Sequence, residues 1–177
     1  MKKNLKIAVS GKSGCGNTTV SRLVAERLGL SFINFTFRSL AKERGMSLNE
    51  LLALAVTDDS WDREVDQRQV QLARESAGCV LGSRLAIWML EEADLKVFLA
   101  AKPEIRTARI MKREGGNFDE VAAFTAERDR QDTSRYIRIY NIDNNNYEFA
   151  NVIINTDDLG PDKIAQIIIE AAEKIQQ

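Results

Sequence analysis

Residues 6–28 read KIAVSGKSGCGNTTVSRLVAERL. The segment joins an apolar run at Ile7–Val9 to a loop with three glycines, and then to a helical pattern of apolar residues. A strand, a glycine-rich loop and a helix in this order are the context of a phosphate-binding loop. Glycines let the backbone approach an anion, and the first amides of the helix point into the loop. The segment therefore predicts a strand–loop–helix unit that binds a polyphosphate.

One position departs from the usual phosphate-loop pattern, G-x-x-x-x-G-K-[ST]. Asn17 stands where the lysine is expected and carries no charge, whereas Thr18 keeps the hydroxyl that faces Mg²⁺ in such loops. Lys12 could supply part of the missing charge from another direction. The alternative is an ordinary glycine-rich turn. We expect a nucleotide-phosphate site formed by Gly11, Lys12, Ser13, Gly14, Cys15, Gly16, Asn17, Thr18 and Thr19.

The composition restricts the classes of function. A chain of 177 residues can form one domain with a full core, and a net charge of −1 gives no bulk attraction to nucleic acid or anionic membranes. The absence of histidine excludes Ser-His-Asp catalysis and histidine-ligated zinc. Cys15 and Cys79 do not resemble a disulfide framework, and no apolar run suits a signal peptide or a membrane span. We expect a cytoplasmic monomer whose partners are small molecules.

Apolar strand candidates alternate with helical patterns along the chain. These candidates lie at residues 7–9, 30–33, 79–81, 95–100 and 152–155. The alternation predicts an α/β fold, with a parallel sheet covered by helices on both faces. Segments 35–77 and 114–140 are helical, more charged and less apolar than the rest. We expect them to form two flaps on a core made of 1–34, 78–113 and 141–177.

The second flap contains charged residues at helical spacing. Arg128, Asp132 and Arg135 are spaced i, i+4, i+7 and therefore share one helix face. Guanidinium groups bind phosphate oxygens bidentately, so the arginines could clamp a transferring phosphate and replace the charge that Asn17 lacks. Asp132 could hold both arginines in position. The alternative is a salt-bridged face exposed to solvent.

Three other arginines are candidates for a second phosphate site. Arg38 and Arg63 lie in the first flap. Arg84 follows the strand candidate at 79–81, and the carboxyl ends of parallel strands face the ligand crevice. A surface position is the default for each arginine alone, but their presence together with the loop favours a site for a second anion.

Several segments, in the same order, resemble the nucleoside monophosphate kinases, and most closely the short, archaeal-type branch of the cytidylate kinases. The resemblance covers nearly the whole chain, and its main segments are Phe37–Leu48, Asp62–Gln69, Val80–Met89, Ala93–Val97, Arg135–Tyr136, Tyr140–Asp143 and Val152–Thr156. It implies a P-loop NTPase core with an acceptor-binding flap at 35–77 and a lid at 114–140. It also implies transfer of the ATP γ-phosphoryl group to CMP or dCMP, with Mg²⁺ as a cofactor.

The resemblance also implies roles for the charged side chains. By motif position, the residues that would contact the acceptor nucleotide are Arg38, Arg63, Arg84 and Asp132. The residues that would assist the transfer are Arg128, Arg135, Asp132 and Lys12, with Arg128 and Arg135 as lid arginines. Thr18 would face the metal ion.

Two departures from that branch bear on the function. Gly82–Ser83 replaces a Glu-Gly pair at a strand end, and Phe35–Phe37 replaces a Gly-Glu-Ile-Phe run before Arg38. Asn17 is a smaller departure, because the branch commonly has threonine in place of the lysine. Two alternatives remain open: a kinase of another small acceptor on the same scaffold, and a nucleotide-binding protein without turnover, which Asn17 and Gly82 favour.

Overall fold

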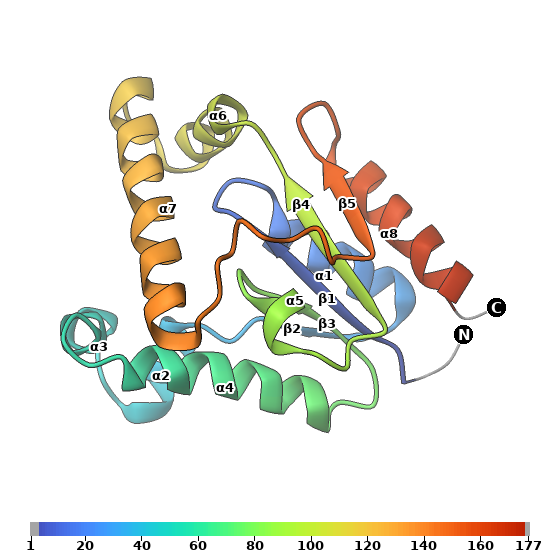
Figure 1. Cartoon of the computed structure of the whole chain (residues 1–177), viewed down its shortest axis with the longest axis horizontal. Helices are drawn as coiled ribbons and strands as arrows, with labels where there is room; N and C mark the ends of the chain where they lie inside the picture. Colours follow the sequence, from blue (N-terminus) through green and yellow to red (C-terminus); the bar gives the residue numbers. More distant parts are fainter. Residues whose placement is uncertain (1–3, 176–177) are drawn as a thin grey trace.

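Five parallel strands form a single sheet in the order β2-β3-β1-β4-β5 in the computed structural model, which describes residues 4–175 (Figure 1). The strands are β1 (Lys6–Gly11), β2 (Ser31–Ile33), β3 (Cys79–Gly82), β4 (Leu95–Ala100) and β5 (Val152–Asn155). The central strand β1 pairs with β3 through Ile7 and Val80, and with β4 through Val9 and Val97. All five strand candidates form strands, and the α/β fold class is confirmed.

Helices connect the strands. They are α1 (Asn17–Leu28), α2 (Phe37–Arg44), α3 (Leu48–Ala55), α4 (Ser60–Glu75), α5 (Ala86–Met89), α6 (Pro103–Glu114), α7 (Phe118–Tyr140) and α8 (Pro161–Ile175). Local signals explain several of their ends. Ser47 and Glu50 form a reciprocal capping box at the start of α3, and Gly29 ends α1 in a left-handed conformation with φ 64°. Among residues 4–175 no helix is both long and apolar enough to cross a bilayer.

Each face of the sheet carries its own apolar cluster. Ile7 and Val9 of β1 pack against α1 and α8, through side chains such as Val20 and Ile168. On the opposite face, Ala8 packs with side chains from β3, β4, α4 and α5. Because consecutive residues of a strand point to opposite faces, a strand buried on both faces is a continuous apolar run. This accounts for the uninterrupted apolar sequence at the centre of β1.

The segment 35–77 has an apolar cluster of its own. Phe35, Leu40, Leu51 and Val65 hold α2, α3 and α4 together, apart from the two clusters on the sheet. Figure 1 shows the long helix α7 running from α6 to the region of α3 and α4. These helices therefore lie around the carboxyl ends of β1 and β3, where the phosphate-binding loop is located.

Candidate active site

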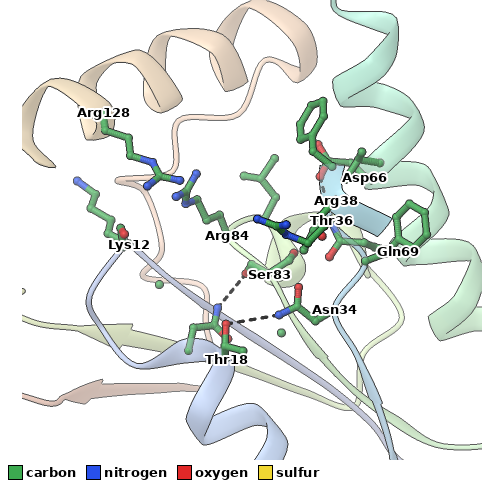
Figure 2. Close-up of a pocket in the computed structure, with 18 of the residues that line it drawn as sticks. Lys12, Thr18, Asn34, Thr36, Arg38, Asp66, Gln69, Ser83, Arg84 and Arg128 are labelled. Atoms are coloured by element: carbon green, nitrogen blue, oxygen red, sulfur yellow. Dashed lines mark hydrogen bonds between the residues drawn. The ribbon is translucent and has the colours of Figure 1, made fainter. Parts of the chain in front are cut away.

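A cleft of about 600 Å³ lies at the carboxyl ends of β1 and β3 (Figure 2). The loop before α1 lines one side, and residues 34–38 with α4 line another. The segment after β3 and the inner face of α7 complete the wall. The cleft therefore joins the predicted phosphate loop to side chains from both helical segments.

The loop is shaped to receive an anion. Gly14 and Gly16 adopt φ values of 85° and 89°, and Gly16 precedes α1 without a side-chain cap for the first helix amides. A Cβ atom on Gly14 would lie 2.9 Å from the carbonyl oxygen of Arg106, so packing also requires glycine there. Arg106 donates a hydrogen bond to the carbonyl of Ser13 at 3.1 Å. The loop is thus held from outside, while its amides remain available to phosphate oxygens.

Asn17 does not point toward the phosphate position. Its side-chain amide donates to the carbonyl oxygens of Val9, at 3.0 Å, and Ser83, at 3.2 Å. Its oxygen accepts a hydrogen bond from the Ser21 hydroxyl at 2.9 Å. Asn17 therefore ties the start of α1 to the ends of β1 and β3.

Gly82 belongs to the same contact. A Cβ atom on Gly82 would lie 2.7 Å from the Ser21 Oγ and 3.1 Å from the Asn17 Oδ1. Real Cβ atoms do not approach other atoms at the shorter distance, so a larger residue at position 82 would force the Ser21 side chain or α1 to shift. The two departures at positions 17 and 82 are therefore parts of one packing arrangement.

Lys12 reaches the cleft from the tip of the loop. Its ammonium donates to the Asn145 side-chain oxygen at 2.8 Å. The Asp143 carboxylate holds Asn145, accepting from its backbone and side-chain nitrogens at 2.9 and 2.8 Å. In Figure 2, Lys12 and Arg128 lie at the same end of the cleft. The loop therefore has a cation near the phosphate position, although it comes from a different direction than the usual lysine.

A buried carboxylate organises two arginines across the cleft. Asp132 of α7 lies 2.7 Å from Arg84 and 2.8 Å from Arg135. Arg135 also lies 3.2 Å from Asp62 of α4. Asp132 thus links α7 to the segment after β3, and Arg135 links α7 to α4. The expectation that Asp132 holds Arg128 as well as Arg135 is corrected: its second partner is Arg84, which the spacing within one helix cannot indicate.

Arg128 remains unpaired among residues 4–175, whereas Arg84 and Arg135 are ion-paired. Burial and the nearby Arg84 guanidinium lower the pKa of Arg128, since both disfavour its positive charge. Figure 2 shows the Arg128 and Arg84 guanidinium groups pointing toward one another across the cleft. Two like charges at close range favour an anion between them.

The two arginines of the first flap lie in different places. Arg38 lines the cleft. Arg63 does not: it is exposed, and its guanidinium carbon lies 5.9 Å from the centre of the Tyr140 ring. The expectation that Arg63 contacts the acceptor is therefore not supported by its position. Val65 lines the cleft, so the face of α4 that includes it turns toward the cleft, and Arg63 falls outside that face.

The family model of the cytidylate kinase-like family matches residues 6–158. The chain belongs to the cytidylate kinase-like family. It is 42% identical to cytidylate kinase 2 of Borreliella afzelii (strain PKo), over 96% of this chain and 97% of that protein. It is 40% identical to the cytidylate kinase of Pyrococcus horikoshii, over 98% of this chain and 91% of that protein. Membership in this family of nucleoside monophosphate kinases confirms the enzyme class predicted from the sequence.

Solved structures confirm the fold. Shikimate kinase from Bacteroides thetaiotaomicron superposes with a TM-score of 0.67 at 18% identity, covering 96% of this chain and 98% of that chain. Shikimate kinase from Acinetobacter baumannii, in complex with shikimate, has a TM-score of 0.65 at 18% identity, with 98% and 95% coverage. At this identity the likeness concerns the arrangement of sheet and helices alone.

Within this cytidylate kinase-like chain, most of the predicted loop residues line the cleft. They are Gly11, Lys12, Ser13, Gly14, Gly16, Asn17, Thr18 and Thr19. The Cys15 side chain instead is buried in the core beneath the loop, and burial raises its pKa. Thr18 is exposed, with its hydroxyl 3.4 Å from the Asn34 amide nitrogen. The loop spacing therefore predicted which residues line this side of the cleft, apart from the orientations of Cys15 and Asn17.

Sequence reasoning missed the polar residues of α4. Asp62, Asp66 and Gln69 line the cleft together with Val65. The signal that could have found them is helical spacing, since positions 62, 65, 66 and 69 share one face. Burial raises the pKa of Asp66 to about 6, although the hydrogen bond from the Tyr140 hydroxyl, at 2.8 Å, opposes this rise. A polar and partly desolvated surface thus forms the end of the cleft away from Lys12.

Proposed function

We propose that this chain transfers the γ-phosphoryl group of ATP in line to CMP or dCMP, giving CDP or dCDP. The observation that carries the proposal is the convergence of one uncapped phosphate loop and several arginines, among them Arg38, Arg84 and Arg128, on one cleft. Two anions could bind there, one on the loop and one among the arginines. The family relatives, named cytidylate kinases, support the choice of acceptor.

ATP and Mg²⁺ fit the loop side of the cleft. The loop amides and the start of α1 would bind the phosphates, with Lys12 as the nearby cation. The exposed hydroxyl of Thr18 would face Mg²⁺, which neutralises charge on the phosphates when it is bound. Mg²⁺ commonly binds through substrate phosphates and few protein ligands, so a full cage of protein ligands is not required.

Arginines would bind and align the acceptor. Arg38 and Arg84 would hold its phosphate, while Asp132 keeps Arg84 and Arg135 in position. The second pKa of a phosphate monoester is about 6, so the acceptor oxygen is largely ionised near neutral pH and needs no general base. This agrees with a chain that has no histidine. Arg128 would stabilise the charge that spreads over the transferring group.

The two helical segments would act as moving parts. We assign 35–77 as an acceptor-binding flap and 114–140 as a lid, on a core of 1–34, 78–113 and 141–177. Closure would exclude water, which otherwise competes with CMP for the phosphoryl group. The ion pairs of Arg135 with Asp62 and of Arg138 with Asp59 join the two segments and support a coupled closure.

The acceptor is tested by measuring ADP release from ATP and Mg²⁺ in separate reactions with CMP, dCMP, UMP, AMP, GMP and dTMP. We expect acceleration by CMP and dCMP. If a different nucleotide alone accelerates ADP release, the proposed phosphoryl transfer stands, but the proposed acceptor, CMP or dCMP, is wrong. No acceleration by any of the six, from folded protein that binds ATP, would contradict the proposal and favour a different acceptor or a binding protein.

A further inference from the structure

Gln69 carries an unsatisfied hydrogen-bond acceptor in the wall of the cleft. Its side chain is buried, with 5% of the residue surface exposed, and it lines the cavity. The amide nitrogen donates to Asp66 Oδ1 at 3.3 Å. Among residues 4–175 the amide oxygen of Gln69 has no hydrogen-bond partner. Buried polar atoms in folded proteins are nearly always paired, so this oxygen indicates a missing donor.

The neighbours of Gln69 determine which of its atoms is free. Asp66 Oδ2 accepts a hydrogen bond from the Tyr140 hydroxyl at 2.8 Å, and Asp66 Oδ1 accepts from the Gln69 nitrogen. An ionised carboxylate is an acceptor only, so it holds the amide nitrogen on its own side. The amide oxygen is therefore left facing other groups, and it can be satisfied only by a donor.

The position of Gln69 suits the base of a nucleotide. Figure 2 places Asp66 and Gln69 at one end of the cleft and Lys12 and Arg128 at the other, with Arg84 between them. Phe35, Phe37 and Val65 line the same cavity near α4 and provide apolar surface. If the arginines hold the phosphate of the acceptor nucleotide, its base would lie toward this apolar end of the cleft.

We propose that the Gln69 side-chain oxygen accepts a hydrogen bond from the exocyclic amino group of the acceptor base, and that this contact selects cytosine over uracil. The inference rests on the proposed function. Cytosine has an amino group at C4, whereas uracil has a carbonyl oxygen there. With uracil, two acceptors would face each other in a buried site, and Gln69 would remain unpaired. Sites built to pair a polar group reject analogues that lack the partner.

The test compares kcat/KM for CMP and UMP in wild-type protein and in Gln69→Leu, which has a similar volume and no acceptor. We expect the CMP-to-UMP ratio to fall at least 10-fold, mainly through a loss with CMP. Gln67→Leu, at an exposed position on the same helix, is the matched control and should keep the wild-type ratio. An unchanged ratio in folded Gln69→Leu would overturn the inference.

A second measurement uses wild-type protein and does not depend on any variant folding. The substrate is the monophosphate of a pyrimidin-2-one nucleoside, which has hydrogen in place of the amino group of CMP. We expect its kcat/KM to be at least 10-fold below that of CMP. Equal values for the two would contradict the amino-group contact while leaving CMP phosphorylation intact. Failure of wild-type protein to phosphorylate any nucleotide would instead overturn the proposed function, and the inference with it.

Discussion

The phosphate loop and the two helices that face it, α4 and α7, are built in different ways. The loop obtains its shape from local backbone geometry, and Asn17 ties it to the adjacent strand ends. The helix pair instead meets through side chains distant in sequence, such as Tyr140 and Asp66, which are 74 residues apart. One region offers mainly backbone amides to a ligand, and the other offers charged side chains.

This difference between the loop and the helices suggests that they do different work: the loop binds phosphates, and the helices supply charge. Because position 17 is an asparagine, the loop lacks the usual cation there, and Lys12 at the loop tip is a cation nearby. Arg128, on α7, has no ion-pair partner among residues 4–175. We therefore propose that Arg128 of α7, in the segment assigned as a lid, supplies most of the charge stabilisation during transfer, and that the loop positions the phosphates.

The largest expected effect comes from Arg128→Ala. Loss of one preorganised cation from a phosphoryl-transfer site should lower kcat by about 100- to 1000-fold. The melting temperature should change little, since Asp132 keeps its ion pairs with Arg84 and Arg135 and, among residues 4–175, no ion pair involves Arg128. Steady-state kinetics and thermal unfolding measure the two quantities.

Arg130→Ala is the matched control on the same helix. The Arg130 side chain is 74% exposed, and within the described part of the chain its ion-pair partner is Glu127 of its own helix, so kcat should stay within a few-fold of wild type. An unchanged kcat in Arg128→Ala would reject the assignment of charge stabilisation to the lid.

Asn17→Lys tests the loop side and should have a smaller effect on kcat. Lysine has no acceptor for the Ser21 hydroxyl, and a longer side chain that extends to the phosphates leaves the Val9 and Ser83 carbonyls without their donor, so we expect a loss of about 1–3 kcal/mol in the free energy of unfolding. Restoring the usual phosphate-loop residue should therefore not raise kcat. Asn49→Lys, at an exposed position, controls for the added charge. A clear rise in kcat with unchanged stability would contradict the claim that charge stabilisation comes mainly from Arg128 and not from the loop.

The smallest expected effect is a pH dependence of base selection. Asp66 has a pKa of about 6, raised by burial, and it faces Tyr140 and Arg135 of α7, Asp62 of α4 and Arg84. As the pH falls through 6, Asp66 gains a proton and no longer has to hold the amide nitrogen of Gln69. The amide group can then turn, so that its oxygen accepts from protonated Asp66 and its nitrogen, which cannot accept from cytosine, faces the base. The CMP-to-UMP ratio of kcat/KM should fall a few-fold between pH 7.5 and pH 5.5.

Using a ratio removes the ionisation of the acceptor phosphate, which CMP and UMP share. Asp66→Asn should show no such change, because it cannot titrate.

The folded pKa of Asp66 lies above its unfolded value near 4, so its stabilising proton is fully bound below pH 4 and lost as the pH rises through 6. The free energy of unfolding should decline across this window in wild type relative to Asp66→Asn. If the CMP-to-UMP ratio of kcat/KM in wild type does not change with pH, Asp66 does not influence base selection.

The sequence was sufficient to predict the fold and the residues of the loop that line one side of the cleft. Local signals specify these parts: the glycine spacing of residues 11–16, the capping box at Ser47 and Glu50, and the alternation of strands with helices. The orientation of Asn17 was not predictable, because it depends on close packing between Ser21 and Gly82. The contact of Asp132 with Arg84 was missed for a similar reason, since it joins elements far apart in the chain. Side-chain pairs across a cleft depend on tertiary packing, which spacing within one helix does not encode.

The central claim is that one cleft brings a loop-bound ATP and an arginine-bound nucleotide together for direct transfer. The measurement that tests it most directly follows the isotopically labelled γ-phosphate of ATP in wild-type protein incubated with Mg²⁺ and CMP. The account predicts that the label appears in CDP, in amounts equal to the ADP formed. Label released as inorganic phosphate, or retained in ATP although both nucleotides bind, would contradict it.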